Sequence, residues 1–507
     1  MVGLLEDQRG RSRKEIPYLL GVFLLGLGLR AIPELLSPYP VGYDTPLYVA
    51  SSPHLHELEP RDLLRKAFLL PAFLWFLNHF LRLDLLLAMR VLTPALYGLL
   101  MSSFYFFLRR GLDWPRRKSL FCTVVCSLQP ASLRISWDLF KNELGLVMLF
   151  LFLVLLRGGG RSRREWFLLG AVAFLVVLSH QLASVMMFAS VLAELLRSRK
   201  DRRYIERLLT CIAPASLLFS YQLGVFVGLI PKPPQNWFRP VVELRIYGSN
   251  PGSKSLFPRN YFEEAPFSWG GWLELYGFVV GFLFFCYLPM WFFVLPGLRR
   301  HRLLDPISIW LSLAFFSILI CPTAYPFYSF HRWGLMMVFP FSVYYTDGLL
   351  KILDRVRSAE ANKVALASVL ALNAFLGLGY TTGNASYISV SVARFFMPGK
   401  MLLSTVEVHR IDMCRACLMW LNENADENSV LVAEKRFSYW AMNWLDERIA
   451  IALYDHGILL EEVDLEPVIS SYEHIYLIWY SQEEISWHGH EFREIYRCGD
   501  ISIYELL

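Results

Sequence analysis

The sequence predicts a polytopic α-helical membrane protein with about eleven transmembrane helices, followed by a C-terminal α/β domain outside the membrane. The 507 residues are 55% hydrophobic and only 18% charged, with a mean hydropathy of +0.39. Apolar runs long enough to cross a bilayer recur from residue 17 to about residue 380. From Thr381 onward the hydropathy falls, and 20 acidic residues stand against 9 basic ones. We therefore expect a transmembrane domain, 1–380, and an extracytoplasmic domain, 381–507.

The distribution of Lys and Arg predicts the topology. The first apolar run is not followed by a small-residue cleavage site, so we expect a retained helix rather than a signal peptide. Six short segments hold 26 of the 49 basic residues, namely Arg9–Lys14, Arg109–Lys118, Arg157–Arg164, Arg197–Arg207, Arg299–Arg302 and Lys351–Lys363. The positive-inside rule places all six in the cytoplasm, with an even number of spans between each and the next. The expected spans are 17–36, 85–108, 119–136, 139–156, 166–181, 183–196, 208–230, 271–296, 304–322, 333–350 and 364–380.

One apolar segment, Leu63–Leu81, is not counted as a span. It carries Arg65 and Lys66, and counting it would move the next basic segment to the outside. An amphipathic helix along the outer interface fits it better. The outer side then holds a first loop, 37–84, and a long loop, 231–270, which is rich in Pro, Asn, Gly and aromatic residues.

The charge distribution does not indicate nucleic-acid binding, and the cysteines give only a weak signal for a zinc site. The net charge of +5 combines about −11 from Thr381 onward with about +16 for the rest of the chain. Because the basic excess lies in membrane loops, it does not indicate nucleic-acid binding. Five of the eight cysteines lie in apolar segments, where we expect them to pack. Cys414-x-x-Cys417 without a second pair is only a weak zinc signal.

The first outer loop contains an acidic side chain at the membrane edge. Asp44 lies between Tyr43 and Tyr48, and Gly42 and Pro46 bracket it, which predicts a turn. A carboxylate at the mouth of a bilayer-embedded bundle is costly and usually faces protein or water. The stretch is therefore a candidate functional site, although a polar turn that happens to contain Asp is the simpler alternative.

Further polar residues interrupt apolar runs on the same side. They are Asp138, Lys141, Asn142 and Glu143 at the start of the fourth span, His180 and Gln181 after the fifth, and His331 and Arg332 before the tenth. Asp138 and Asn142 are four residues apart and are expected to share one helical face, and Lys141 could form a salt bridge with Asp138.

Each of these residues also has a structural interpretation. Asp138 and Lys141 could form an ion pair at a helix N-terminus. His180 could cap a turn, and Arg332 could reach the lipid headgroups. Their common position on one side favours a joint chemical site instead. There, Asp44 and the second carboxylate could deprotonate an acceptor or hold a divalent cation, Mg²⁺ or Mn²⁺, while the cations could bind a phosphate at headgroup level.

The two acidic motifs resemble those of the GT-C superfamily, integral-membrane glycosyltransferases that use polyprenyl-phosphate-linked sugar donors. Gly42–Asp44 with Tyr48 looks like the acidic motif of the first loop, and Asp138 with Asn142 and Glu143 looks like the second acidic motif. The resemblance covers nearly the whole chain by layout and leans toward archaeal members and the oligosaccharyltransferase catalytic subunit. A GT-C-like fold is therefore expected.

The C-terminal part both supports and limits this resemblance. The run from Trp420 to Val432 resembles the entry to the external domain of an oligosaccharyltransferase. Where that enzyme carries a Trp-Trp-Asp-Tyr-Gly block that reads an Asn-x-Ser/Thr acceptor, this chain has Glu434–Trp440, without the acceptor-reading Trp and Asp. Strand-like runs at 430–433, 448–453 and 474–479 and a hairpin turned at Gly499 predict an α/β fold.

By resemblance, the chain is expected to transfer a sugar from a dolichyl-type polyprenyl phosphate to a lipid, glycan or protein acceptor outside the membrane. Asp44 would be the catalytic base or a metal-linked carboxylate, and Asp138 its partner. The expected residues for the donor and its lipid phosphate are Arg332, His331, Lys141, His180, Tyr43, Tyr48 and Asn142. Two alternatives stay open, which are a diverged oligosaccharyltransferase acting on protein and a flippase of lipid-linked sugars. A flippase is expected to show internal repeats and polar residues near the bilayer midplane, neither of which the sequence shows.

Overall fold

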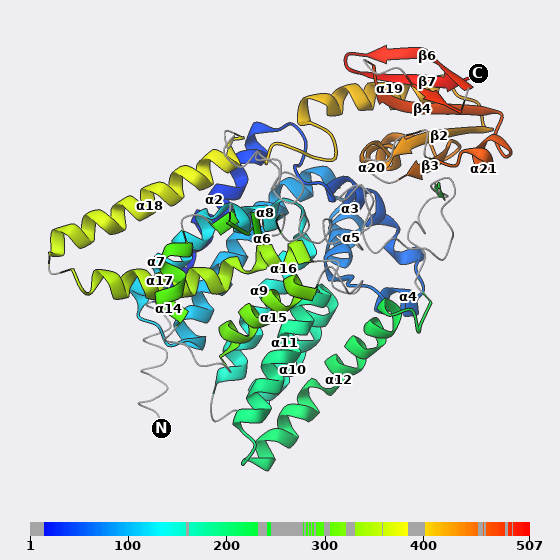
Figure 1. The fold of residues 1–507 in the computed structure, drawn as a ribbon. Helices are drawn as coiled ribbons and strands as arrows, with labels where there is room; N and C mark the ends of the chain where they lie inside the picture. The colour runs from blue at the N-terminus through cyan, green and yellow to red at the C-terminus, as the bar shows by residue number, and fades with distance from the viewer. Residues whose placement is uncertain are drawn as a thin grey trace.

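The computed structural model describes residues 15–158, 162–231, 241–244, 290–298, 305–320, 330–356, 358–383, 401–454, 463–481, 485–488 and 490–507, with single positions between 277 and 287 and residue 460. Figure 1 shows a helical body with a sheet-containing part at one end. The helices of the body are α2 (Ile16–Leu36), α3 (Thr45–Ser51), α4 (Pro60–Leu64), α5 (Leu69–Leu81), α6 (Leu85–Phe106), α7 (Arg116–Leu128), α8 (Pro130–Asp138), α9 (Phe140–Arg157), α10 (Arg163–Ser179), α11 (Gln181–Arg197), α12 (Arg202–Phe226), α14 (Trp291–Leu298), α15 (Pro306–Ile320), α16 (Phe330–Met336), α17 (Val338–Leu353) and α18 (Ala359–Thr381).

The part that follows α18 is an α/β layer. Its elements are α19 (Ile411–Asn424), β2 (Ser429–Glu434), α20 (Lys435–Trp444), β3 (Ala450–Tyr454), α21 (Glu466–Ile469), β4 (His474–Tyr480), β5 (Ser486–Trp487), β6 (His490–Cys498) and β7 (Ile501–Leu506). The strand order is β1-β3-β2-β4-β7-β6-β5. β2 pairs in parallel with both β3 and β4, and β7 is antiparallel to β4 and β6. The β6–β7 hairpin turns at Gly499, which has the positive φ of 60° that such a turn favours.

The edge strand of this sheet comes from the loop between the helices. β1 (Val241–Glu243) pairs in parallel with β3, with Val241 opposite Ile451. This pairing ties a segment of the expected long outer loop, 231–270, to the C-terminal part. Apart from Pro231 and residues 241–244, that loop lies outside the described residues.

Close helix packing in the body depends on small residues. A Cβ built on Gly348 of α17 would lie 1.8 Å from the carbonyl oxygen of Phe293, and one on Gly297 of α14 would lie 1.9 Å from that of Tyr344. Only glycine permits this approach of α14 and α17, in the way that small residues let helices pack in membranes.

One helix break differs from the expected spans, and a second coincides with the expected boundary between the spans 119–136 and 139–156. The sequence predicts one span over 119–136, but α7 ends at Leu128 and α8 begins at Pro130. Gln129 is extended because a residue before proline is disfavoured in the helical region. α8 and α9 then meet at a bend of 115°. The segment 63–81, for which an interfacial helix was expected, contains the helix α5, preceded by the short α4.

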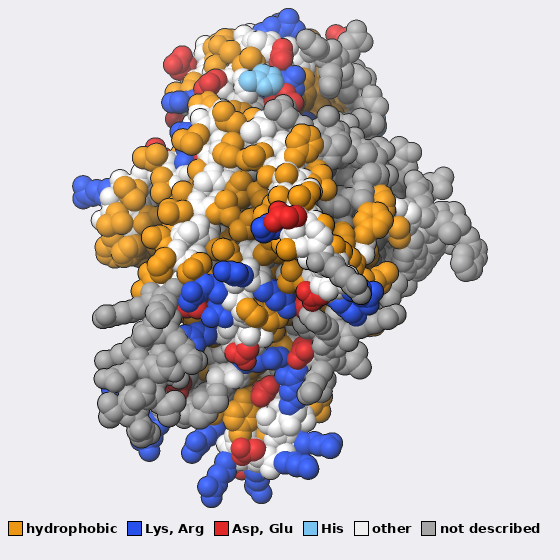
Figure 2. All heavy atoms as spheres, turned by 90° about the vertical axis from the view of Figure 1, so that its left-hand side faces the viewer, with side chains coloured by type: hydrophobic (Ala, Val, Ile, Leu, Met, Phe, Trp, Pro, Cys, Tyr) orange, Lys and Arg blue, Asp and Glu red, His pale blue; other side chains and the backbone are white. Residues whose placement is uncertain are grey.

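The surface of the body is apolar around its middle. In Figure 2, hydrophobic side chains form a broad band, and Lys and Arg gather at the lower end, away from the sheet. Exposed side chains on the body include Leu24, Val91, Phe167, Leu217 and Phe375. Within the described ranges, four helices are long and apolar enough to cross a membrane (α2, α6 with its last turn to Gly111, α12 and α18), or five if α8 and α9 form one bent span.

Candidate functional site

Asp44 lies at the start of α3, at the end of the body that carries the sheet. It occupies the N-cap position, but its carboxylate accepts no capping hydrogen bond. One reason is that Pro46 follows in the first turn, so one of the amides that an N-cap oxygen usually binds is missing. Asp44 is partly exposed, and its carboxylate has no hydrogen bond or ion pair with any other described residue. The carboxylate is therefore available to a ligand.

Gly42 brings the two acidic segments together. Its φ is +123°, and a Cβ there would lie 2.1 Å from the carbonyl oxygen of Trp137, next to Asp138. No other residue type fits this position without moving one of the two segments. Gly42 is therefore needed not only for the turn before Asp44 but also for the close approach of this loop to α8.

The structure corrects the expected partner of Asp138. Its carboxylate forms an ion pair with Arg134, one turn earlier in α8, rather than with Lys141. The expected common face of Asp138 and Asn142 is also wrong, because the chain bends at Leu139 between them. An i,i+4 relation holds only within one continuous helix, and here it joins Arg134 to Asp138.

The carboxylate of Asp44 is surrounded by charges from four other elements. Burial, followed by the nearby carboxylate of Asp138, raises the pKa of Asp44 to about 6, and the cations of Arg332, Lys141 and Lys435 oppose this rise. A carboxyl group poised near neutral pH can exchange protons readily, which is the property that a general base needs.

Two lysines, Lys141 and Lys66, act on one another near this carboxylate. The ammonium of Lys141 lies 5.1 Å from the ring centroid of Tyr48, whose side chain is buried. Burial and the charge of Lys141 lower the pKa of Lys66 to about 8. Holding two partly buried ammonium groups in each other's field costs free energy, and an anionic ligand would relieve that cost. Lys66 was not predicted as a site residue, because its charge counted only against a membrane span over 63–81.

His180 and Arg332 occupy the same region. His180 is the N-cap of α11, where its Nδ1 accepts the amide of Leu182 at 3.1 Å, so the capping interpretation is correct. Arg332 and Lys141 both act electrostatically on His180, which places the three together. The Nε of Arg332 is buried and has no hydrogen-bond partner among the described residues. The side chain of the expected donor-binding residue His331 lies outside the described residues.

The C-terminal part closes one side of the site. α20 begins at Lys435, directly after β2, and lies on α3, where Asn443 donates to the carbonyl of Pro46 at 2.9 Å. The ring of Tyr439 contacts that of Tyr43, with centroids 6.0 Å apart. The segment Glu434–Trp440 therefore lies close to the loop that carries Asp44. Lys435 was missed as a site residue, although it belongs to the block that the sequence analysis singled out.

Asn142 and Glu143 of the second acidic motif point into the protein. Both side chains are buried, at 2% and 0% exposure, and their polar atoms have no hydrogen-bond partner in the described parts of the chain. The charge that acts on Glu143 is Arg30, on α2. The role expected of Asn142 in donor binding stays a prediction.

The residues around Asp44 fit a divalent cation poorly. Mg²⁺ takes about six oxygen ligands. Asp138 is engaged by Arg134, and three cations surround Asp44. Over the described ranges, no group of three His, Cys, Asp or Glu side chains could hold a metal ion. The mechanism proposed below uses no metal.

Comparisons with known proteins give structural neighbours only. No family model matches the sequence, and no curated protein matches it. The chain is similar to ArnT from Cupriavidus metallidurans in the apo state, with 14% identity, coverage of 98% of each chain and a TM-score of 0.49. The same protein bound to undecaprenyl phosphate gives 13% identity, coverage of 98% of each chain and a TM-score of 0.48.

A second neighbour is the archaeal oligosaccharyltransferase AglB from Archaeoglobus fulgidus, in complex with an inhibitory peptide and a dolichol-phosphate. The identity is 12%, the alignment covers 91% of this chain and 69% of that chain, and the TM-score is 0.48.

Proposed function

We propose that this chain is a membrane glycosyltransferase that transfers a sugar from a polyprenyl-phosphate-linked donor to an acceptor at the outer face of the membrane. The observation that carries the proposal is the composition of the site. The carboxylate of Asp44 has no partner among the described residues and a pKa of about 6, and Lys141, Arg332 and Lys435 surround it. A base beside several cations suits a reaction in which a nucleophile loses a proton and a phosphate leaves.

The proposed reaction is a single displacement at the anomeric carbon. Asp44 accepts the proton of the acceptor nucleophile, which attacks as the bond between the anomeric carbon and the phosphate oxygen breaks. The phosphate leaves with that electron pair, and Lys141, Lys66 and Arg332 stabilise its developing charge. The carboxylate of Asp138 stabilises the positive charge that develops on the sugar in the transition state. Attack opposite to the leaving group inverts the anomeric configuration.

The proposed orientation follows from the basic segments. Arg157 and Arg197 both form ion pairs with Asp305, at 3.0 and 2.9 Å, which brings two basic segments to the beginning of α15. Arg109 forms an ion pair with Glu15 at 2.7 Å, and this contact joins a third basic segment to the residue that precedes α2. The sheet lies at the other end of the body (Figure 1). The positive-inside rule then puts Asp44 and residues 381–507 outside the cell.

The function is tested with the full-length protein in lipid vesicles and a panel of radiolabelled polyprenyl-phosphate sugars, with acceptors supplied as lipid, glycan and peptide. We expect release of polyprenyl phosphate and transfer of the label with one of the donors. Label on an Asn-x-Ser/Thr peptide would instead support the oligosaccharyltransferase alternative. Labelled lipid that crosses the bilayer without being consumed would contradict the proposal and support a flippase.

The rate of transfer is expected to rise with pH through about 6, because the pKa of Asp44 is raised to about that value and only its carboxylate accepts a proton. Below this value the protonated acid cannot act as a base, and above it the rate levels off. The measurement is kcat against pH with saturating donor. A rate that does not change across this range would remove Asp44 from the rate-limiting proton transfer.

A further inference from the structure

The two acidic segments are held by their backbones rather than by their carboxylates. Among the residues that the structure describes, Asp44 has no hydrogen-bond or ion-pair partner, and the carboxylate of Asp138 pairs with Arg134 of its own helix. A glycosyl transfer of the kind proposed above needs the two carboxylates at a fixed separation, because misplacement of a catalytic group by about 1 Å can cost about 100-fold in rate. The contacts that set this separation must therefore come from elsewhere.

Arg30, on α2, binds both segments at once. Its side chain is fully buried, its Nε donates to the carbonyl of Ser136 at 2.9 Å, and its Nη2 donates to that of Val41 at 3.5 Å. Ser136 lies two residues before Asp138, and Val41 lies three residues before Asp44. One rigid guanidinium plane thus spans the backbone of the two segments.

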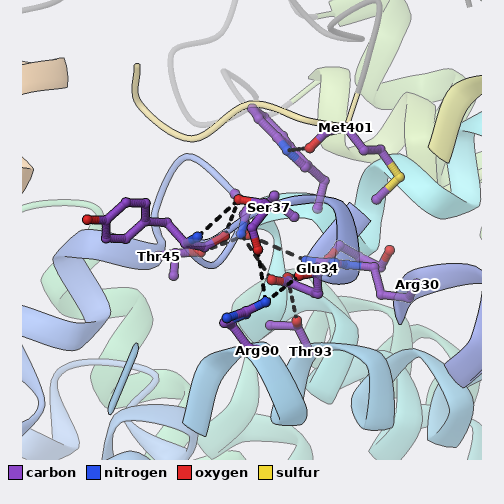
Figure 3. A network of polar contacts seen from close by, with 12 residues as sticks. Arg30, Glu34, Ser37, Thr45, Arg90, Thr93 and Met401 are labelled. Carbon is purple, nitrogen blue, oxygen red and sulfur yellow. Dashed lines mark hydrogen bonds and ion pairs between the residues drawn. The ribbon is translucent and has the colours of Figure 1, made fainter. Parts of the chain in front are cut away.

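Glu34, one turn further along α2, completes this contact, and Figure 3 shows it between Arg30 and the loop. It forms an ion pair with Arg30 at 2.8 Å and accepts the amide of Val41 at 3.3 Å. The hydroxyl of Thr93, on α6, donates a hydrogen bond to the Oε1 of Glu34 at 3.1 Å. The buried guanidinium is therefore neutralised and oriented by a carboxylate that also binds the loop.

A second bridge lies on the opposite side of the two segments. The carbonyl of Leu403 accepts the amide of Gly42 at 3.0 Å and the indole N–H of Trp137, also at 3.0 Å. Trp137 also donates to the carbonyl of Met401 at 3.1 Å (Figure 3). Gly42 lies two residues before Asp44, and Trp137 directly precedes Asp138.

Burial by itself does not account for this arrangement. Buried polar groups are usually paired, but Asn142 and Glu143, just beyond the bend, are equally buried and have no partner in the part of the chain that the structure describes. The hydrogen bonds are concentrated on the few backbone groups that flank Asp44 and Asp138.

We propose that Arg30, Glu34 and Trp137 are positioning residues that fix the separation of the Asp44 and Asp138 carboxylates. The proposal rests on the proposed function of this acid pair. None of the three is placed in contact with the donor, so loosening them changes the chemical step and leaves donor binding as it was.

The test is Trp137→Phe, which keeps an aromatic ring and removes one N–H that bridges two carbonyls. The matched control is Trp310→Phe, because Trp310 is fully buried and its indole N–H has no partner among the described residues. We expect kcat to fall about 10-fold or more in Trp137→Phe, with the donor KM within about 2-fold of wild type. Trp310→Phe is expected to keep the wild-type kcat.

A second readout does not depend on sugar transfer. The titration of Asp44 can be followed by infrared difference spectroscopy of each variant against its Asp44→Asn counterpart. Asp44 faces Asp138 and Arg134 on α8, Lys141 on α9, Arg332 on α16 and Lys435 on α20, and Asp138 acts on it more strongly than Arg134 does. If the α8 segment moves away, the repulsion from Asp138 weakens, so the midpoint of the titration should fall below about 6 in Trp137→Phe and stay unchanged in Trp310→Phe.

The outcomes separate this proposal from the proposed function. Absence of transfer with every donor, together with the expected lowering of the midpoint, would reject the glycosyltransferase and keep the positioning role. An unchanged midpoint and a wild-type kcat in folded Trp137→Phe would overturn the positioning role. If that variant does not fold, Thr93→Val, which removes only one donor to Glu34, is measured in the same way and is expected to shift the midpoint in the same direction. An unchanged midpoint in Thr93→Val would count equally against the proposal.

Discussion

Replacement of Asp44 by Asn is expected to lower kcat for sugar transfer by about 10²–10⁴-fold, the usual contribution of a general base. The amide would keep the shape of the side chain but could not accept a proton. The cations of Lys141, Arg332 and Lys435 remain. In the variant, the Asp44 carboxylate no longer competes with the donor phosphate for these cations. Donor binding should therefore be kept or strengthened. Single-turnover transfer and binding of the labelled donor measure the two effects separately.

Asp113→Asn is the matched control for this substitution. Asp113 is exposed, has a φ of +53° and lies between α6 and α7, in one of the basic segments. Asn is well suited to such a backbone conformation, so the change should leave both activity and stability unaltered. Equal activity of Asp44→Asn and the wild type would show that another group takes the proton.

Replacement of Arg332 by Gln is expected to weaken binding of the donor by about 10- to 150-fold. A hydrogen bond to a charged group contributes about 1.5–3 kcal/mol, and each 1.4 kcal/mol is a factor of about ten in the dissociation constant. The buried Nε of Arg332 has no hydrogen-bond partner among the described residues, as expected of a donor that binds an anionic ligand. Equilibrium binding of a polyprenyl-phosphate donor, measured for both proteins at one ionic strength, tests this.

The same variant has an expected effect on pH dependence. Arg332 lowers the pKa of Asp44, so its loss should move the acid limb of the kcat profile above about 6. This direction is opposite to that expected for Trp137→Phe. Arg203→Gln is the control, because Arg203 is exposed on α12 at the basic end of the body. Unchanged donor binding in Arg332→Gln would place the phosphate elsewhere.

The bend between α8 and α9 marks the limit of reasoning from periodicity. The i,i+4 spacing of Asp138 and Asn142 predicted that they share one helical face, and the i,i+3 spacing of Lys141 allowed a salt bridge with Asp138. The bend at Leu139 separates Asp138 from both residues. Arg134, one turn before Asp138, lies on the same side of the bend and forms the ion pair in place of Lys141.

The sequence by itself predicted an apolar helical body followed by an α/β part, and it singled out Asp44 and Asp138 as candidate site residues. Long apolar runs and basic loops are local properties that a bilayer dictates, and an Asp at a turn between apolar runs stands out for the same reason. Only the tertiary structure decided which groups gather around Asp44. Lys66, Lys435 and Arg332 come from separate loops and helices, and their approach to this region depends on how α3, α5, α16 and α20 pack together. The positioning contacts of Arg30 and Trp137 could not be predicted from the sequence either. Both side chains donate to backbone carbonyls, and the pattern of side chains does not indicate where those carbonyls lie.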